Sequence, residues 1–138
     1  MTPRNTSTGA VLEAMILPAL DRGGYVWRVQ IETGIRPGGR RHQVDALAEK
    51  SNEQILLSLK WQQTSGTAEQ KVPFEVMCLA DAIRNGKGDR AYLVLGGDGW
   101  TLRDYYTSGS LADHLTHAAL VRVVTLEAFV RLANNGQL

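Results

Sequence analysis

The sequence SLKWQ at residues 58–62, which follows the apolar run ILL at residues 55–57, decides the fold of this chain. A short apolar run that passes into alternating polar and apolar residues is typical of a buried β-strand. In such a strand successive side chains point to opposite faces, so Ser58, Lys60 and Gln62 share one face and the apolar residues occupy the other.

A lysine on a buried strand requires a negatively charged partner, because an unpaired charge is costly to bury. The sequence offers Asp45 before this strand and Glu75 after it. Two carboxylates beside Lys60 would satisfy its charge and could also hold a divalent metal ion. The grouping is typical of a metal-dependent phosphodiesterase.

Length and composition predict one globular domain over residues 1–138. Apolar residues make up 43% of the chain and charged residues 21%, which is ordinary for a globular protein. The net charge of +1 excludes nucleic-acid binding through bulk charge, so any such binding must depend on local basic patches.

The single cysteine, Cys78, excludes an internal disulfide and a zinc cluster made of cysteines. Its apolar neighbours predict a buried thiol and not a nucleophile. His114 and His117 have no third ligand nearby in the sequence, so they do not predict a zinc site. No apolar run reaches the length of a membrane span, and the N-terminus lacks a signal-peptide core, so we expect a cytoplasmic protein.

The remaining sequence predicts helices and strands in alternation. Helices are expected over residues 6–20, from residue 67 or 70 to 85, and over 125–132; strands are expected over 25–33, 42–49, 54–61, 91–95 and 120–124. Pro18 is expected to kink the first helix near its end. Hairpins followed by a helical crossover imply a mixed sheet with helices on both faces.

This order of elements, with Asp45 on the second strand and Ser58-Leu59-Lys60 on the third, resembles the PD-(D/E)XK nuclease superfamily. That superfamily includes type II restriction endonucleases and archaeal Holliday-junction resolvases. The resemblance covers roughly residues 9–97. It implies an α/β, restriction-endonuclease-like fold, in which α-helices flank a mixed β-sheet in a single domain. Asp45 and Lys60 match the family residues, although Val44 stands where a proline is frequent.

Ser58 departs from the family pattern, because a second acid usually occupies its position. A subgroup of restriction endonucleases has Ser-x-Lys on this strand and supplies the missing carboxylate from the following helix. The resemblance therefore implies that Glu75, fourteen residues beyond Lys60, replaces the acid, with Glu69 as the second candidate. Glu75 falls near the apolar stripe of its helix, whereas Glu69 precedes Pro73.

The resemblance implies a catalytic group that includes Asp45, Ser58, Lys60 and Glu75. Asp45, Glu75 and the carbonyl of Leu59 would bind Mg²⁺, for which Mn²⁺ could substitute. Lys60 would stabilise the charge that develops in the transition state. Two further groups are candidates by resemblance or position, namely Gln62 with its neighbour Gln63, and Glu13 on the first helix.

The expected partner is DNA, bound mainly through its phosphates. The basic candidates for these contacts are Arg36, Arg40, Arg41, Lys71, Arg84 and Lys87. A homodimer is expected if both strands of a duplex are cut, because one active site cuts one strand.

Each candidate residue also has a purely structural interpretation. Glu75 could be an exposed residue paired with Lys71, and Glu13 an exposed helix acid. Gln62 and Gln63 could be polar edge residues, and the arginine pair at 40–41 a solvated hairpin tip. His42 either contacts DNA or has no function.

The sequence thus favours a metal-dependent DNA endonuclease. Two alternatives stay open at this point. One is a catalytically weak DNA-binding or partner-binding module with the same fold, and the other is a nuclease specific for Holliday junctions.

Overall fold

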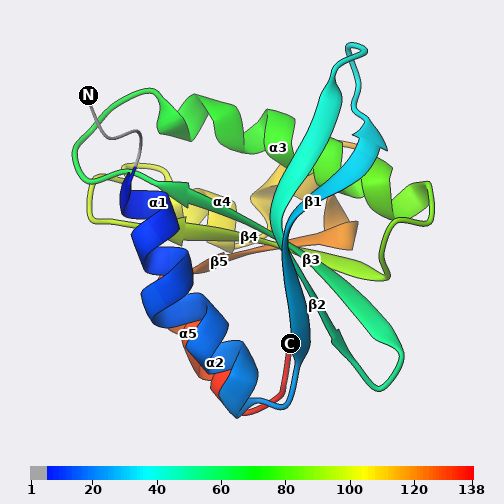
Figure 1. Ribbon diagram of the computed structural model, residues 1–138. Helices are drawn as coiled ribbons and strands as arrows, with labels where there is room; N and C mark the ends of the chain where they lie inside the picture. The colour runs from blue at the N-terminus through cyan, green and yellow to red at the C-terminus, as the bar shows by residue number, and fades with distance from the viewer. Residues whose placement is uncertain (1–5) are drawn as a thin grey trace, which may run out of the picture.

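In the computed structural model, which describes residues 6–138, a central five-stranded sheet lies between two layers of helices (Figure 1). The strands occur in the order β1-β2-β3-β4-β5 and span Val26–Ile35, Arg41–Lys50, Glu53–Trp61, Arg90–Gly96 and Val121–Thr125. The first three strands are antiparallel, whereas β4 and β5 run parallel to β3. The prediction of a mixed sheet flanked by helices is therefore confirmed.

Two hairpins join the antiparallel strands. The β2–β3 connection places Ser51 and Asn52 at positive φ, 54° and 66°, which matches the twist of a two-residue hairpin turn. The β1–β2 connection carries the Pro-Gly-Gly sequence of residues 37–39, as the turn residues predicted. Both hairpins are local, so the sequence pattern located these three strands to within two residues.

One face of the sheet is covered by α1 (Thr6–Val11), η1 (Leu12–Ile16), α2 (Leu17–Arg22) and α5 (Leu126–Asn134). The single helix expected over residues 6–20 is instead interrupted, because η1 is a π-helical turn. Pro18 supplies the reason: it has no N–H to donate to the carbonyl four residues earlier, and its ring crowds that carbonyl. The helical turn just before Pro18 therefore contains one extra residue, and the chain continues as the α-helix α2.

The opposite face is covered by α3 (Ala68–Arg84), with α4 (Arg103–Thr107) and two short 3₁₀ turns, η2 (Ser110–Asp113) and η3 (Ala118–Leu120), beside it. Pro73 lies inside α3 without ending it. The carbonyl of Glu69, which Pro73 cannot bond, instead accepts a hydrogen bond of 2.7 Å from the Tyr106 hydroxyl. The helix is thereby tied to the segment at 100–107, which the sequence pattern left without assigned structure.

The sheet has a hydrophobic core on each face, and the two cores contact alternate residues of β3. Leu57 and Leu59 pack toward α2 and α5, whereas Leu56 packs toward α3. Ser58 and Lys60 therefore lie on the α3 side, as the alternation predicted. Among residues 6–138, no helix combines the length and the hydropathy that a membrane span requires.

Candidate active site

The candidate site begins where β2 and β3 separate. Their antiparallel ladder runs from Lys50 opposite Glu53 to Ala46 opposite Leu57 and goes no further. Beyond this point the Asp45 carboxylate accepts the Leu59 N–H at 2.7 Å, in the place of a strand-to-strand hydrogen bond. Because a residue in an extended strand directs its N–H and C=O to the same side, the Leu59 carbonyl also faces Asp45.

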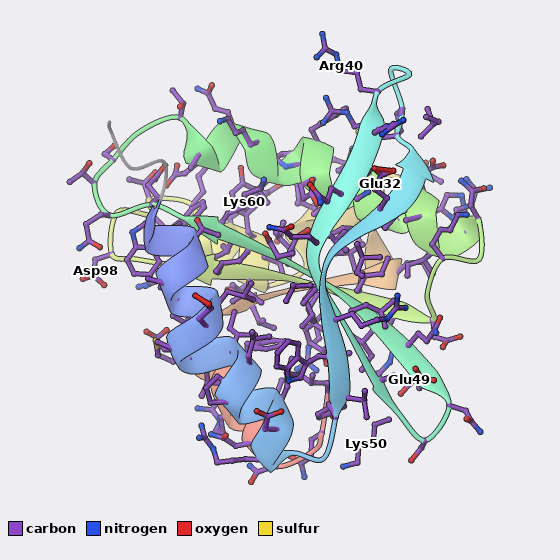
Figure 2. The ribbon with its side chains drawn as sticks, viewed as in Figure 1. Glu32, Arg40, Glu49, Lys50, Lys60 and Asp98 are labelled. Atoms are coloured by element: carbon purple, nitrogen blue, oxygen red, sulfur yellow. The ribbon has the colours of Figure 1, made fainter. Side chains whose placement is uncertain are left out.

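A pocket of about 440 Å³ opens at this separation and is lined by residues of α1 and η1 from one face of the sheet and of α3 from the other. Asp45 reaches it from β2, Ser58 and Lys60 from β3, and Glu75 from α3. Figure 2 shows Lys60 between α1 and α3, consistent with the residues of both helices that line the pocket. The structure thus brings together four of the residues that the sequence selected.

Glu75 is buried and is held by two hydrogen bonds to the same oxygen. The Ser58 hydroxyl donates to Glu75 Oε2 at 2.7 Å, and His42 Nε2 lies 3.0 Å from that atom. A carboxylate can only accept, so the Nε2 proton of His42 points at Glu75. Oε1 has neither bond, and Glu75 lines the pocket with Asp45. The interpretation of Glu75 as an exposed partner of Lys71 is therefore wrong.

The sequence analysis did not connect His42 to Glu75. His42 is 4% exposed, and its second ring nitrogen, Nδ1, lies 2.7 Å from the Thr33 hydroxyl. Thr33 reaches it through a β-bulge: Glu32 pairs with Gln43 and Gly34 pairs with His42, which leaves Thr33 as the extra residue, turned inward. No local sequence pattern signals a bulge whose side chain serves a neighbouring strand.

The two carboxylates have opposite pKa shifts. Burial raises the pKa of Asp45 above its ordinary value of 3.8, and its bond to Leu59 and the charge of Lys60 offset only part of this effect. Burial also raises the pKa of Glu75, but the hydrogen bonds from His42 and Ser58 and the charge of Lys60 outweigh it, so the pKa lies below 4.5. The hydrogen bonds and charge around Glu75 outweigh its burial, whereas those around Asp45 do not.

Glu69, the second candidate for the missing acid, is engaged elsewhere. Its carboxylate accepts hydrogen bonds from the backbone N–H of Thr101, from the Thr101 hydroxyl at 2.7 Å and from the Leu102 N–H at 3.2 Å. The bond from the Thr101 hydroxyl is the main reason that the pKa of Glu69 lies below 4.5. Glu69 does not line the pocket that holds Asp45 and Lys60.

Gln62 does not join the catalytic group either. β3 ends at Trp61, and the buried Gln62 side chain donates to the Gly99 carbonyl at 2.7 Å. Gly97, at φ 91°, lies so close to the Gln62 backbone that an added Cβ would stand 2.4 Å from its carbonyl oxygen. The expected catalytic contact of Gln62 is thus replaced by a structural contact with the loop at 97–99.

Glu13 lies beside the pocket but not in it. It is exposed on η1 and lines a neighbouring hollow that shares Gly9, Leu12 and Gln30 with the main pocket. Gln30 is a residue that the sequence analysis missed. It lines the main pocket, and its φ of 54° is strained for a residue other than glycine.

Four of the six predicted DNA contacts fall in two places. Arg36, Arg40 and Arg41 surround the tip of the β1–β2 hairpin, where Figure 2 shows Arg40 extending away from the protein. Arg41 forms an exposed ion pair with Glu32 at 3.3 Å, and Arg36 lies over the Phe74 ring. Lys71 lines the pocket, one helical turn before Glu75.

A family model of the PD-(D/E)XK nuclease superfamily domain matches residues 4–137, nearly the whole sequence. The chain belongs to the PD-(D/E)XK nuclease superfamily. This membership agrees with the five-stranded mixed sheet, and it confirms the resemblance drawn from Asp45 and Lys60.

Among solved structures, AF1548, a protein of unknown function, is similar to 80% of this chain at 9% sequence identity, with a TM-score of 0.48. The chain spans about half of that protein, 54% of its length. No curated protein matches the sequence.

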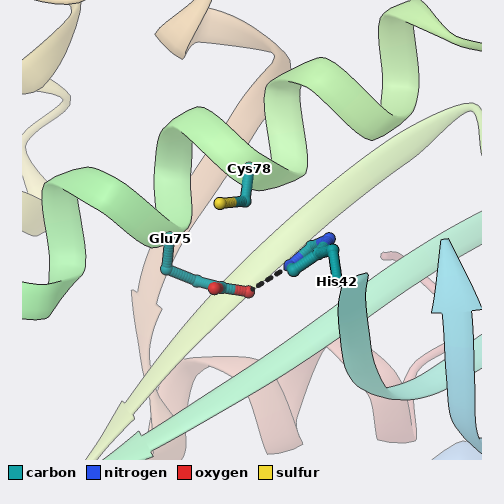
Figure 3. A group of neighbouring side chains, drawn as sticks. All are labelled: His42, Glu75 and Cys78. Atoms are coloured by element: carbon teal, nitrogen blue, oxygen red, sulfur yellow. Dashed lines mark hydrogen bonds and ion pairs between the residues drawn. The ribbon is translucent and has the colours of Figure 1, made fainter. Parts of the chain in front are cut away.

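PD-(D/E)XK nucleases usually use divalent metal ions, and the structure offers two groups of possible ligands. Asp45, Glu75 and the Leu59 carbonyl offer oxygen alone at the pocket. His42, Glu75 and Cys78 form a second, buried group, in which one ligand atom from each lies within 4.8 Å of the others (Figure 3). Cys78 is 1% exposed, so the prediction of a buried thiol is confirmed.

Proposed function

We propose that this chain is a Mg²⁺-dependent endonuclease that hydrolyses phosphodiester bonds in DNA. The observation that supports the proposal most directly is the convergence of Asp45, Lys60 and Glu75 on one pocket from three separate elements. The same set of charges on a single helix or loop would be common at any surface. Superfamily membership supports nuclease chemistry, and we expect the charged residues that line the pocket to perform it.

The residues at the pocket suit a hard divalent cation. Mg²⁺ prefers oxygen ligands, and Asp45, Glu75 and the Leu59 carbonyl supply only oxygen. Burial raises the pKa of Asp45, and a bound cation would stabilise its charged form. Bound there, the ion would supply Lewis-acid activation of the phosphate and of the attacking water.

The protein's own residues would position and stabilise the reacting groups. The Leu59 N–H fixes Asp45, while Ser58 and His42 fix Glu75, so both carboxylates are oriented before any ligand arrives. Lys60 projects from the strand between them and would stabilise the negative charge that develops on the phosphate oxygens. By analogy with the superfamily, in-line attack leaves a 5′-phosphate and a 3′-hydroxyl.

The position of the basic residues supports DNA as the substrate. Lys71 at the pocket would contact a phosphate near the cleaved bond, and Arg40 and Arg41 at the hairpin tip would contact the backbone further along. The ion pair of Arg41 with Glu32 is exposed and therefore weak, so a phosphate could replace the carboxylate. Cleavage of both strands would use two copies of the chain, each with one site.

Cleavage of supercoiled plasmid in Mg²⁺ or in EDTA tests the proposal. We expect metal-dependent nicking by the wild type and a loss of about 10²–10³-fold in Lys60→Ala, since a charge-stabilising group is removed. Arg131→Ala, at an exposed position on α5, is the matched control and should keep full activity. Equal inactivity of the wild type and Lys60→Ala on plasmid, linear duplex and four-way junctions would contradict the proposal and favour a binding module.

A further inference from the structure

The group of His42, Glu75 and Cys78 lies behind the proposed Mg²⁺ site and shares only Glu75 with it. His42 comes from β2, and Glu75 and Cys78, three residues apart, lie on one side of α3 (Figure 3). All three are buried, with exposures of 4%, 9% and 1%. The pocket that holds Asp45 and Lys60 is lined by neither His42 nor Cys78.

The three ligand types in this group differ from those of a Mg²⁺ site. An imidazole nitrogen, a thiol sulfur and a carboxylate oxygen form a mixed set that Zn²⁺ accepts and Mg²⁺ avoids. Zinc bond lengths of about 2.0–2.3 Å require ligand atoms about 3–4 Å apart. His42 Nε2 and Glu75 Oε2 are already 3.0 Å apart, and all three ligand atoms lie within 4.8 Å, so only small side-chain movements are needed.

The thiol is available for a metal ion. Burial, reinforced by the charge of Glu75, raises the pKa of Cys78 to about 11, so the metal-free group is a neutral S–H. Among residues 6–138 it has no hydrogen-bond partner, unlike His42 and Glu75. A cation bound here would displace the thiol proton to solvent and replace the hydrogen bond between His42 and Glu75 with two metal–ligand bonds. His42 would exchange its Nε2 proton for one on Nδ1, which would then donate to the Thr33 hydroxyl oxygen.

We propose that His42, Glu75 and Cys78 form a Zn²⁺ site that restrains the enzyme, in the sense that bound zinc lowers its Mg²⁺-dependent cleavage activity. Ser58 or a water molecule would complete the four ligands. Zinc would draw Glu75 away from the side of the pocket where Asp45 lies and would place a second positive charge beside the Mg²⁺ position. Mg²⁺ would then bind more weakly. The zinc site stands on its own geometry, whereas the restraint rests on the proposed nuclease function.

Titration of tag-free protein with Co²⁺, a spectroscopic substitute for Zn²⁺, tests the site without any activity measurement. Cys78 is the only cysteine, so a sulfur-to-cobalt charge-transfer band can arise only from this residue. We expect one equivalent of Co²⁺ to produce the band and Zn²⁺ to abolish it. Absence of the band at saturating Co²⁺ would overturn the site.

Four variants separate this site from the catalytic one. Cys78→Ala should lose the band, and His42→Gln and Glu75→Gln should weaken Co²⁺ binding at least tenfold. Asp45→Asn, which damages only the Mg²⁺ site, should keep the band and the affinity of the wild type. Circular dichroism verifies that each variant is folded. A band whose affinity is the same in wild type, His42→Gln and Glu75→Gln would contradict the three-ligand site.

The restraint is tested by adding Zn²⁺ to the Mg²⁺-dependent cleavage reaction. Cys78→Ala should match the wild type without zinc, because Cys78 does not line the catalytic pocket. Zinc should inhibit the wild type at least tenfold more strongly than Cys78→Ala. Equal inhibition of the two proteins would overturn the restraint. If the chain cleaves no DNA at all, the proposed function fails, while the cobalt band still decides the metal site.

Discussion

Glu69 and Glu75 lie six residues apart on the same helix, and both are buried with a lowered pKa, yet they do different things. Glu69 receives its hydrogen bonds from the chain that follows β4, at Thr101 and Leu102. Glu75 receives its bonds from the sheet, at Ser58 and His42. The partners of these two buried acids, and not their burial or their pKa, distinguish the structural carboxylate from the one that we propose to be catalytic.

Glu69 and Glu75 also differ in how many of their carboxylate oxygens accept hydrogen bonds. Both oxygens of Glu69 accept hydrogen bonds, so its carboxylate is fully used within the protein. Ser58 and His42 both bind Oε2 of Glu75, which leaves Oε1 without a bond from either. A carboxylate held by one oxygen is oriented and still able to bind a metal ion.

The largest expected effect is on catalysis. Glu75→Gln should lower Mg²⁺-dependent cleavage at least about 100-fold, because loss of a direct metal ligand should exceed the 10–100-fold cost of losing a supporting residue. Glu69→Gln, the matched control on the same helix, should keep cleavage within a few-fold of wild type. Plasmid nicking at several Mg²⁺ concentrations measures both. A greater loss in Glu69→Gln would reverse the assignment of the two acids.

The next effect concerns the support of Glu75. His42→Leu should lower cleavage by about 10–100-fold and raise the Mg²⁺ concentration needed for half-maximal rate, because Glu75 is no longer oriented. His42→Gln can keep an N–H near the same position and should recover part of the loss. If both variants lose stability but keep the wild-type Mg²⁺ dependence, His42 is only a packing residue.

The next effects are on the stability of the fold. Glu69→Ala should lower the melting temperature by several degrees, since the N–H groups of Thr101 and Leu102 lose their shared acceptor.

Asp45→Asn should instead raise the melting temperature of metal-free protein at pH 7. The raised pKa of Asp45 means that its charge is disfavoured in the folded state. Thermal unfolding in EDTA measures both, and a less stable Asp45→Asn would contradict this account.

The smallest effect is the dependence of stability on pH. The lowered pKa of Glu69 means that its folded state binds fewer protons than its unfolded state. Its contribution is therefore present above pH 4.5 and lost as the pH falls through the folded pKa. Glu69→Gln should make the denaturation midpoint less sensitive to pH below 4.5 than it is in the wild type. An unchanged slope would show that other carboxylates control acid unfolding.

Much of the fold follows from local patterns in the sequence. The strands at 53–61 and 90–96 and the helix at 68–84 were predicted to within a few residues, because apolar alternation and helical stripes are recorded in neighbouring residues. The segment at 103–120, with α4 and the two 3₁₀ turns, was not predicted, since its short elements depend on tertiary packing. The π-helical turn before Pro18 was expected only as a kink.

The sequence by itself, through its resemblance to the superfamily, predicted that Asp45 and Lys60 would share one site. It also limited the replacement acid to two glutamates on one helix. Only the tertiary structure decided between Glu69 and Glu75, turned Gln62 toward Gly99, and joined Thr33 and His42 to the site. Those outcomes depend on how α3 and the loops pack across the sheet, and contacts between distant segments leave no periodic signal in the sequence.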